Sequence, residues 1–136
     1  MIQFYFLSIL LNGLSGYVLI TDSDDGDAGL DTGFRLSFKN ETCRLILGIL
    51  TIVIGFLKIL SVVQGDVPVI GDLIPALAGF LAGFALVFEY YRSRSTLEPE
   101  HTEKIETLLV HNKKWIGLLA LVAAGLHFLF PSVLFL

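Results

Sequence analysis

Residues with reactive, metal-binding or charged side chains are scarce in this sequence of 136 residues. It has one cysteine, Cys43, three histidines and one tryptophan, and only 16% of its residues are charged. A single cysteine excludes an intrachain disulfide and any metal or redox motif made of paired cysteines. The sequence also lacks a Ser-His-Asp arrangement with supporting glycines, an HExxH pair, a phosphate-binding glycine loop and a basic-aromatic surface for nucleic acid. We therefore expect a protein that is not an enzyme, binds no nucleic acid and uses neither a metal nor another cofactor.

Hydrophobic residues are abundant where charge is scarce. They make up 54% of the chain, and the mean hydropathy is +0.77, far from the values of a soluble domain. The apolar residues separate into four runs, each close to the roughly 20 residues that cross a bilayer as a helix: 2–20, 43–63, 73–91 and 115–136. The prediction is an all-α integral membrane protein in which residues 1–136 form a single bundle of four transmembrane helices.

Basic residues are absent from Met1–Tyr17, and no small-x-small cleavage site follows this run. A cleavable signal peptide has both features, so we expect the first run to remain as a transmembrane helix. Eight of the nine basic residues lie in or beside the two long loops, 21–42 and 92–114. The positive-inside rule then places both loops in the cytoplasm and both termini outside the plasma (inner) membrane.

The second run carries its small and polar residues on one helical face. The residues that share it are spaced at i, i+3, i+7 and i+10: Gly48, Thr51, Gly55 and Lys58. The fourth run repeats this ladder 69 positions further on: Gly117, Ala120, Ala124 and His127. A weaker match relates the first run to the third at a separation of 67 positions. Two hypotheses stay open, a duplicated hairpin that gives a parallel repeat, as in some transporters, or a chance recurrence of small residues.

Small residues also mark the third run, in which Gly79 and Gly83 form a GxxxG motif. In membranes such a motif lets two helix backbones approach closely, but it does not reveal whether the partner helix belongs to the same chain. On the first run, four polar side chains share one face: Tyr5, Ser8, Asn12 and Ser15. This stripe either bonds to neighbouring helices or lines a path for a substrate.

Charged residues near the helix ends give two local predictions. Aspartates crowd the first loop from Asp22 to Asp31, but their spacing does not meet that of a calcium-binding loop, so we expect a solvated acidic loop. At the end of the third run, Arg92 follows Glu89 by three positions. This spacing favours a local ion pair on the helix surface.

The second run, RLILGILTIVIGFLKIL, resembles the opening helix of DoxX-like four-helix membrane proteins, which also place an arginine before a glycine-rich helix ending in Gly-x-x-Lys. Here those positions are Arg44, Gly48, Gly55 and Lys58. The resemblance covers this helix alone, and in this chain the motif falls in the second helix instead of the first. It implies a membrane helix bundle and little about activity.

The expected topology brings four ionisable residues to a similar depth near the outer face: Lys58, Asp66, Asp72 and His127. Together they could hold an anion or relay a proton. In the alternative, Lys58 extends its ammonium to the membrane surface, Asp72 caps the third helix and His127 is an interfacial ring.

Two functions therefore compete. The first is a non-enzymatic accessory or assembly subunit, because the chain is small, lacks catalytic groups and offers helix faces for packing. It would contact membrane lipid and other transmembrane subunits, or further copies of itself. The alternative is a small transporter or channel acting as an oligomer, with a site at Lys58, Asp72 and His127. The sequence names no substrate.

Overall fold

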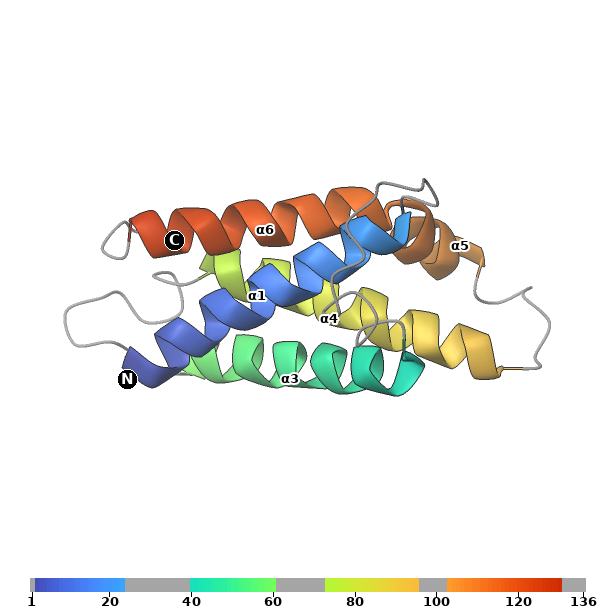
Figure 1. The fold of residues 1–136 in the computed structure, drawn as a ribbon, viewed down its shortest axis with the longest axis horizontal. Helices are drawn as coiled ribbons and strands as arrows, with labels where there is room; N and C mark the ends of the chain where they lie inside the picture. Colours follow the sequence, from blue (N-terminus) through green and yellow to red (C-terminus); the bar gives the residue numbers. More distant parts are fainter. Residues whose placement is uncertain (1, 24–39, 61–72, 96–102, 131–136) are drawn as a thin grey trace.

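The computed structural model describes residues 2–23, 40–60, 73–95 and 103–130. Within these ranges the chain is helical and contains no strand, which confirms the all-α class. The long helices of this described part lie side by side (Figure 1): α1 (Ile2–Ser23), α3 (Glu41–Leu60), α4 (Leu73–Arg94) and α6 (Lys113–Leu129). A short helix, α5 (Glu103–Glu106), and a π-helical turn, η2 (Thr107–His111), precede α6.

The helices reach further into the charged segments than the apolar runs indicate. Helices α1 and α4 continue to Ser23 and Arg94, while α3 and α6 begin at Glu41 and Lys113. Charged residues expected in loops therefore stand on the ends of helices. The expected continuations of α3 to residue 63 and of α6 to residue 136 fall outside the described residues.

Local signals explain where three of the helices begin. Asn40 caps α3, because its side-chain Oδ1 accepts a hydrogen bond from the Thr42 amide at 3.0 Å. Pro75 lies in the first turn of α4, where the missing amide hydrogen costs no helical bond. Asn112 separates η2 from α6, and its carbonyl accepts the first bond of α6 from the Ile116 amide at 3.0 Å.

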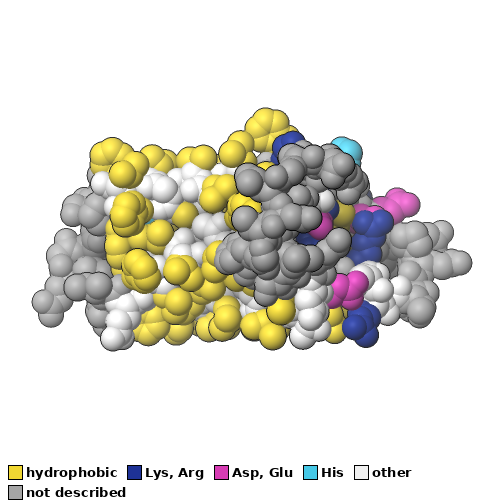
Figure 2. Space-filling view, viewed as in Figure 1, with side chains coloured by type: hydrophobic (Ala, Val, Ile, Leu, Met, Phe, Trp, Pro, Cys, Tyr) yellow, Lys and Arg dark blue, Asp and Glu magenta, His cyan; other side chains and the backbone are white. Residues whose placement is uncertain are grey.

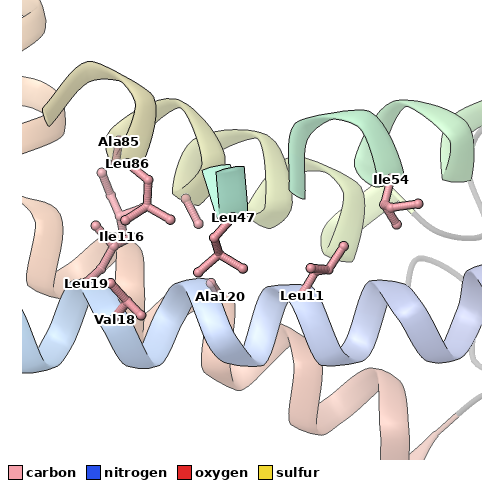
Figure 3. Packing of buried hydrophobic residues seen from close by; sticks show 10 residues of the cluster. Leu11, Val18, Leu19, Leu47, Ile54, Ala85, Leu86, Ile116 and Ala120 are labelled. Atoms are coloured by element: carbon pink, nitrogen blue, oxygen red, sulfur yellow. The ribbon is translucent and has the colours of Figure 1, made fainter. Parts of the chain in front are cut away.

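The interior is built from small and medium side chains contributed by all four long helices (Figure 3). Its buried cluster is Leu11, Val18, Leu19, Leu47, Ile54, Ala82, Ala85, Leu86, Ile116 and Ala120. The largest apolar side chains instead lie on the outside, with Phe6 59% exposed, Phe56 55% and Phe84 52%. On the face shown in Figure 2, hydrophobic side chains cover much of the described surface, and charged side chains gather toward one end.

Three helices of the described residues are long and apolar enough to cross a membrane: Gln3–Asp22, Glu41–Leu60 and Leu73–Arg94. Helix α6 is 17 residues long in the described part, from Lys113 to Leu129. It is as apolar in composition as the other three, and its outer side exposes Leu119 and Phe128.

Helix α1 packs chiefly against α6, and α4 packs chiefly against α3. Each of these close pairs crosses at two facing glycines. A Cβ built on Gly16 would lie 2.6 Å from the Gly117 carbonyl oxygen, and one built on Gly83 would lie 2.8 Å from the Gly48 carbonyl oxygen. Because a backbone oxygen cannot move aside cheaply, these crossings depend on the absence of a side chain.

The two crossings are equivalent in sequence as well as in space. Gly83 follows Gly16 by 67 positions, and Gly117 follows Gly48 by 69. The side chains around them correspond in the same way. Gly117 lies against the side chains of Leu19 and Ile20, and Gly48 against those of Leu86 and Val87.

The other residues expected in helix packing also contact helices of this chain. A Cβ on Gly55 would lie 3.2 Å from the Ala76 carbonyl oxygen, and one on Gly79 would lie 2.7 Å from Asn12 Oδ1. Ala124 is 5% exposed. Both glycines of the GxxxG motif thus face partners within the molecule.

Candidate functional site

Lys58 and His127 meet in the interior, near the C-terminal ends of α3 and α6. Lys58 Nζ lies 2.9 Å from His127 Nε2, a hydrogen-bond distance. Lys58 is 4% exposed and His127 1% exposed. The series of small residues on α3 and on α6 explains this contact. Each series forms the buried face of its helix, and Lys58 and His127 are the last residues of the two series.

Tyr5 of α1 completes the cluster. Its hydroxyl donates a hydrogen bond of 2.5 Å to the backbone carbonyl oxygen of His127. This carbonyl belongs to the last turn of α6, where carbonyls lack intrahelical partners. The Tyr5 ring lies 4.5 Å from the His127 ring, and Lys58 Nζ lies 5.2 Å from the centroid of the Tyr5 ring. Tyr5 therefore orients His127 and offers the ammonium a cation–π contact.

The short distance restricts the charge that the Lys58–His127 pair can hold. A hydrogen bond between two nitrogens needs one donor and one acceptor, so one of them lacks a proton on the contacting side. Two positive charges 2.9 Å apart would repel each other by about 6 kcal/mol at an effective dielectric constant of about 20. One N–H group therefore lies between Lys58 Nζ and His127 Nε2.

This geometry differs from the simpler alternative for Lys58. A lysine that extends to the membrane surface keeps its ammonium exposed, whereas Lys58 points inward and is buried. That alternative is therefore wrong for this structure. Asp66 and Asp72, which were expected near the same site, lie outside the described residues, and their part in the site stays a prediction.

The polar residues between this site and the other end of the bundle bond to backbone carbonyls. Asn12 Nδ2 donates to the Pro75 carbonyl at 2.8 Å, which ties α1 to α4. The hydroxyls of Ser15 and Thr51 donate to carbonyls of their own helices, Leu11 and Leu47, each at 2.7 Å. All three bonds satisfy buried polar groups, and the Asn12 bond also holds α1 against α4.

A second cluster lies at the opposite end of the bundle, where each long helix contributes one charged residue. This charge cluster consists of Asp22 (α1), Arg44 (α3), Glu89 (α4) and Lys113 (α6). Arg44 contacts Asp22 at 3.0 Å and Glu89 at 2.5 Å. Lys113 contacts the same two carboxylates at 2.5 Å and 3.3 Å. Two cations and two anions thus neutralise one another and join all four helices.

The surroundings of Lys113 act on its pKa in opposite directions. Partial burial acts to lower the pKa, but the hydrogen bond to Asp22 and the charge of Glu89 outweigh that effect. The pKa of Lys113 is therefore raised above its ordinary value, so the ammonium is charged at neutral pH.

Two expectations from the sequence are corrected here. Glu89 pairs with Arg44 and Lys113, while Arg92 pairs with Glu106 at 2.8 Å. Asp22 belongs to helix α1 instead of a solvated loop. Local spacing missed the cluster because its contacts join different helices. The repeat in the sequence did indicate this cluster. Its separation of 67 positions relates Asp22 to Glu89, and its separation of 69 positions relates Arg44 to Lys113.

Among the described residues, no group of three or more histidine, cysteine, aspartate or glutamate side chains is placed to hold a metal ion. The two clusters are separated along α3 by the fourteen positions from Arg44 to Lys58, or about 21 Å of helix.

The fold and these two clusters define an all-helical protein with an apolar outer surface and charges concentrated at one end. A model of an uncharacterised protein family matches residues 1–127. An uncharacterised protein of Treponema pallidum (strain Nichols) is 32% identical over 136 residues, which are 100% of this chain and 100% of that protein. The chain therefore belongs to the same family as this T. pallidum protein. No solved structure matches. Neither match bears on the resemblance to DoxX-like proteins, which stays a prediction.

Proposed function

We propose that this chain is a small integral membrane transporter without enzymatic activity, and that its solute site is built on the Lys58–His127 pair. The single observation that carries the proposal is the 2.9 Å contact between two basic side chains that are both more than nine-tenths buried. Ionisable residues are costly inside a membrane and are kept there mainly for function.

The distribution of side chains supports the membrane part of the proposal. Large apolar side chains are exposed along every long helix, and the interior combines leucine, isoleucine, valine and alanine with buried glycines and hydroxyl groups. In water such a surface would be a strong driver of aggregation, whereas in lipid it matches the solvent. Four spanning helices in the inner membrane, with the charge cluster on the cytoplasmic side, agree with the positive-inside rule.

The repeated contacts support transport in particular. Some transporters consist of two halves related by an axis along the membrane normal, with the site at the interface of the halves. Here α1 and α3 make one half, and α4 and α6 make the other. Lys58 comes from the first half and His127 from the second, so the pair lies at their interface. The charge cluster joins the same halves at the other end, where it closes the bundle.

The alternative role as an accessory subunit has less support. One of its grounds was the GxxxG motif as a face for another protein, but Gly79 and Gly83 contact α1 and α3 of the same chain. That role stays a prediction that extraction in a mild detergent would address, because a stable hetero-partner would co-purify.

Flux into liposomes tests the transporter proposal. The purified chain is reconstituted, and entry of a panel of small anions, cations and neutral solutes is followed by vesicle swelling. We expect protein-dependent entry of at least one solute, lost in Lys58→Gln and in His127→Gln. The charge-matched control is Lys104→Gln, which changes an exposed lysine of α5. Equal flux in all four proteins, or no flux above that of empty vesicles, would reject the proposal.

A further inference from the structure

We infer that the bundle opens between its two close helix pairs, α1 with α6 and α3 with α4, and that the charge cluster is the cytoplasmic gate between them. We call the boundary between the two pairs the seam. As a path for a solute, the seam rests on the proposed function, and it explains how the Lys58–His127 site is reached from the cytoplasm.

Inside each helix pair, backbone packs against backbone. A Cβ on Gly117 would lie 2.8 Å from the Gly16 carbonyl oxygen, and one on Gly48 would lie 2.9 Å from the Gly83 carbonyl oxygen. Backbones this close cannot separate without losing many dispersion contacts at once. Each pair therefore moves as one unit.

Polar side chains cross the seam instead. Asn12 of α1 donates its hydrogen bond to the Pro75 carbonyl of α4, and Lys58 of α3 meets His127 of α6. Helices of different pairs also pack less closely than the two helices of one pair. Polar contacts can be replaced by contacts with water or a solute, whereas packed glycine backbones have no such replacement. The bundle therefore parts most easily along the seam.

The charge cluster divides along the same seam. Within the helix pairs, Asp22 binds Lys113 and Arg44 binds Glu89, each at 2.5 Å. Across the seam, Arg44 lies 3.0 Å from Asp22, and Lys113 lies 3.3 Å from Glu89. Opening the seam breaks only the two longer contacts and leaves one cation bound to one anion on each side. Breaking a buried ion pair is costly mainly when it leaves a charge unpaired, and here none is left unpaired.

Thr51 of α3 borders the seam halfway between the gate and Lys58. It follows Arg44 by seven positions and precedes Lys58 by seven, or about 10 Å of helix on each side. A Cβ on Gly79 would lie 2.7 Å from Asn12 Oδ1 and 3.6 Å from Thr51 Cγ2, so these side chains meet where α1 faces α3 and α4. Thr51 is 1% exposed. The structure thus shows the gate closed, and opening it would admit water to Thr51.

The experiment uses a cysteine at this position as a reporter. Thr51→Cys is made in a Cys43→Ala background, which leaves one cysteine in the chain. The Thr51 hydroxyl bonds to the Leu47 carbonyl of its own helix, so the change removes no hydrogen bond between helices. The rate of reaction with a charged methanethiosulfonate reagent is measured on the purified full-length protein in detergent, and helix content is recorded for each variant. This rate reports how often the seam opens to water.

Two charge reversals in the reporter protein distinguish the seam from any other boundary. Asp22→Lys with Lys113→Asp keeps an ion pair inside each helix pair and places like charges across the seam. Asp22→Lys with Arg44→Asp does the opposite: it keeps the ion pairs across the seam and places like charges inside both helix pairs. Both reversals lose two ion pairs and leave the net charge unchanged. We expect the first to raise the rate about tenfold or more and the second to leave it within about twofold.

Two further reversals serve as controls. One restores every ion pair of the cluster with opposite signs and should return the rate to that of the unreversed reporter: Asp22→Lys, Lys113→Asp, Arg44→Glu and Glu89→Arg. The other, Glu41→Arg with Arg94→Glu, reverses an exposed pair outside the cluster and should leave the rate unchanged.

The order of the rates decides the inference. A faster reaction in the second reversal than in the first would show that the bundle opens between the two halves of the sequence, and would overturn it. An unchanged rate or a loss of helix content in the first reversal would also overturn it. If the second reversal fails to fold, the reversal of all four residues still decides, because a fast reaction there would show that the signs of the charges across the seam do not matter.

Flux into liposomes separates this inference from the proposed function. Flux that depends on Lys58, together with a reaction rate that does not respond to the first reversal, would leave the transporter proposal standing and reject the gate alone. A rate that follows the charges as expected, without flux of any solute, would support the seam and reject the transporter proposal.

Discussion

Arg44 and Lys113 bind the same two carboxylates, although they stand on different helices and 69 positions apart. The carboxylates, Asp22 and Glu89, are themselves 67 positions apart. Each cation therefore joins one acid from its own half of the chain to one acid from the other half. A contact of this kind cannot be broken at one helix without affecting all four.

Glu89→Gln tests how much this charge cluster stabilises the bundle. The change leaves Arg44 and Lys113 with one carboxylate between them, and the Glu89 side chain is only 14% exposed. We expect the free energy of unfolding to fall by about 2 to 3 kcal/mol. The measurement is unfolding in mixed detergent micelles, followed by helix content.

Two further variants serve as controls for Glu89→Gln. Glu41→Gln removes an exposed carboxylate whose partner, Arg94, is also exposed, so we expect a change below about 0.5 kcal/mol. The double variant Glu89→Gln with Arg44→Gln restores neutrality and should cost less than the sum of the single changes. Additive costs would contradict a shared cluster.

Adding one methyl group at either glycine crossing should separate a close helix pair. In Gly16→Ala and Gly83→Ala the new Cβ would lie within 2.9 Å of backbone oxygens or of a facing side chain. We expect both variants to lower the midpoint of thermal unfolding by similar amounts, because the two crossings are equivalent. Purified protein in detergent gives this measurement directly.

Gly125→Ala provides the matched control for the glycine variants. A Cβ at Gly125 would meet no atom within 4 Å, and alanine favours helix over glycine by about 1 kcal/mol. The midpoint should stay the same or rise. A loss at Gly125 as large as that at Gly83 would show that the effect comes from the helix backbone and not from packing.

Removing the Tyr5 hydroxyl should weaken the end of α6. Tyr5→Phe keeps the ring against His127 but leaves the His127 carbonyl without this donor, so we expect a loss of about 1 kcal/mol. Tyr91→Phe is the control, since that side chain is 50% exposed. Faster hydrogen exchange at the C-terminal turn of α6 in Tyr5→Phe alone is the expected result; equal exchange in both variants would contradict it.

Cys43 reports the orientation of the chain in the membrane. It stands in the first turn of α3, at the end that carries the charge cluster. A membrane-impermeant maleimide should therefore fail to label it in intact cells and label it once the membrane is opened. The control is Phe130→Cys in a Cys43→Ala background, which should be labelled from outside. The reverse pattern would invert the topology.

The sequence predicted the helices well because hydrophobic length and helical period act locally. It also placed Gly48, Thr51, Gly55 and Lys58 on one face, and the structure buries that face. It did not predict the partners of Glu89. The i,i+3 spacing pointed to Arg92 on the same helix, whereas Glu89 pairs with Arg44 and Lys113 on other helices. It also did not settle the position of the Lys58 ammonium, since a side chain near a helix end can turn outward or inward, and only the position of α6 decides which.

Both close helix pairs join one half of the chain to the other: α1 with α6, and α3 with α4. While the ribosome has produced only α1 and α3, Gly16 and Gly48 lack the glycines that they face in the finished protein. Both close helix pairs therefore form only after α4 and α6 have been synthesised. Because both close pairs join the two halves, exchange of α4 and α6 between two molecules would reuse only contacts that the monomer already makes.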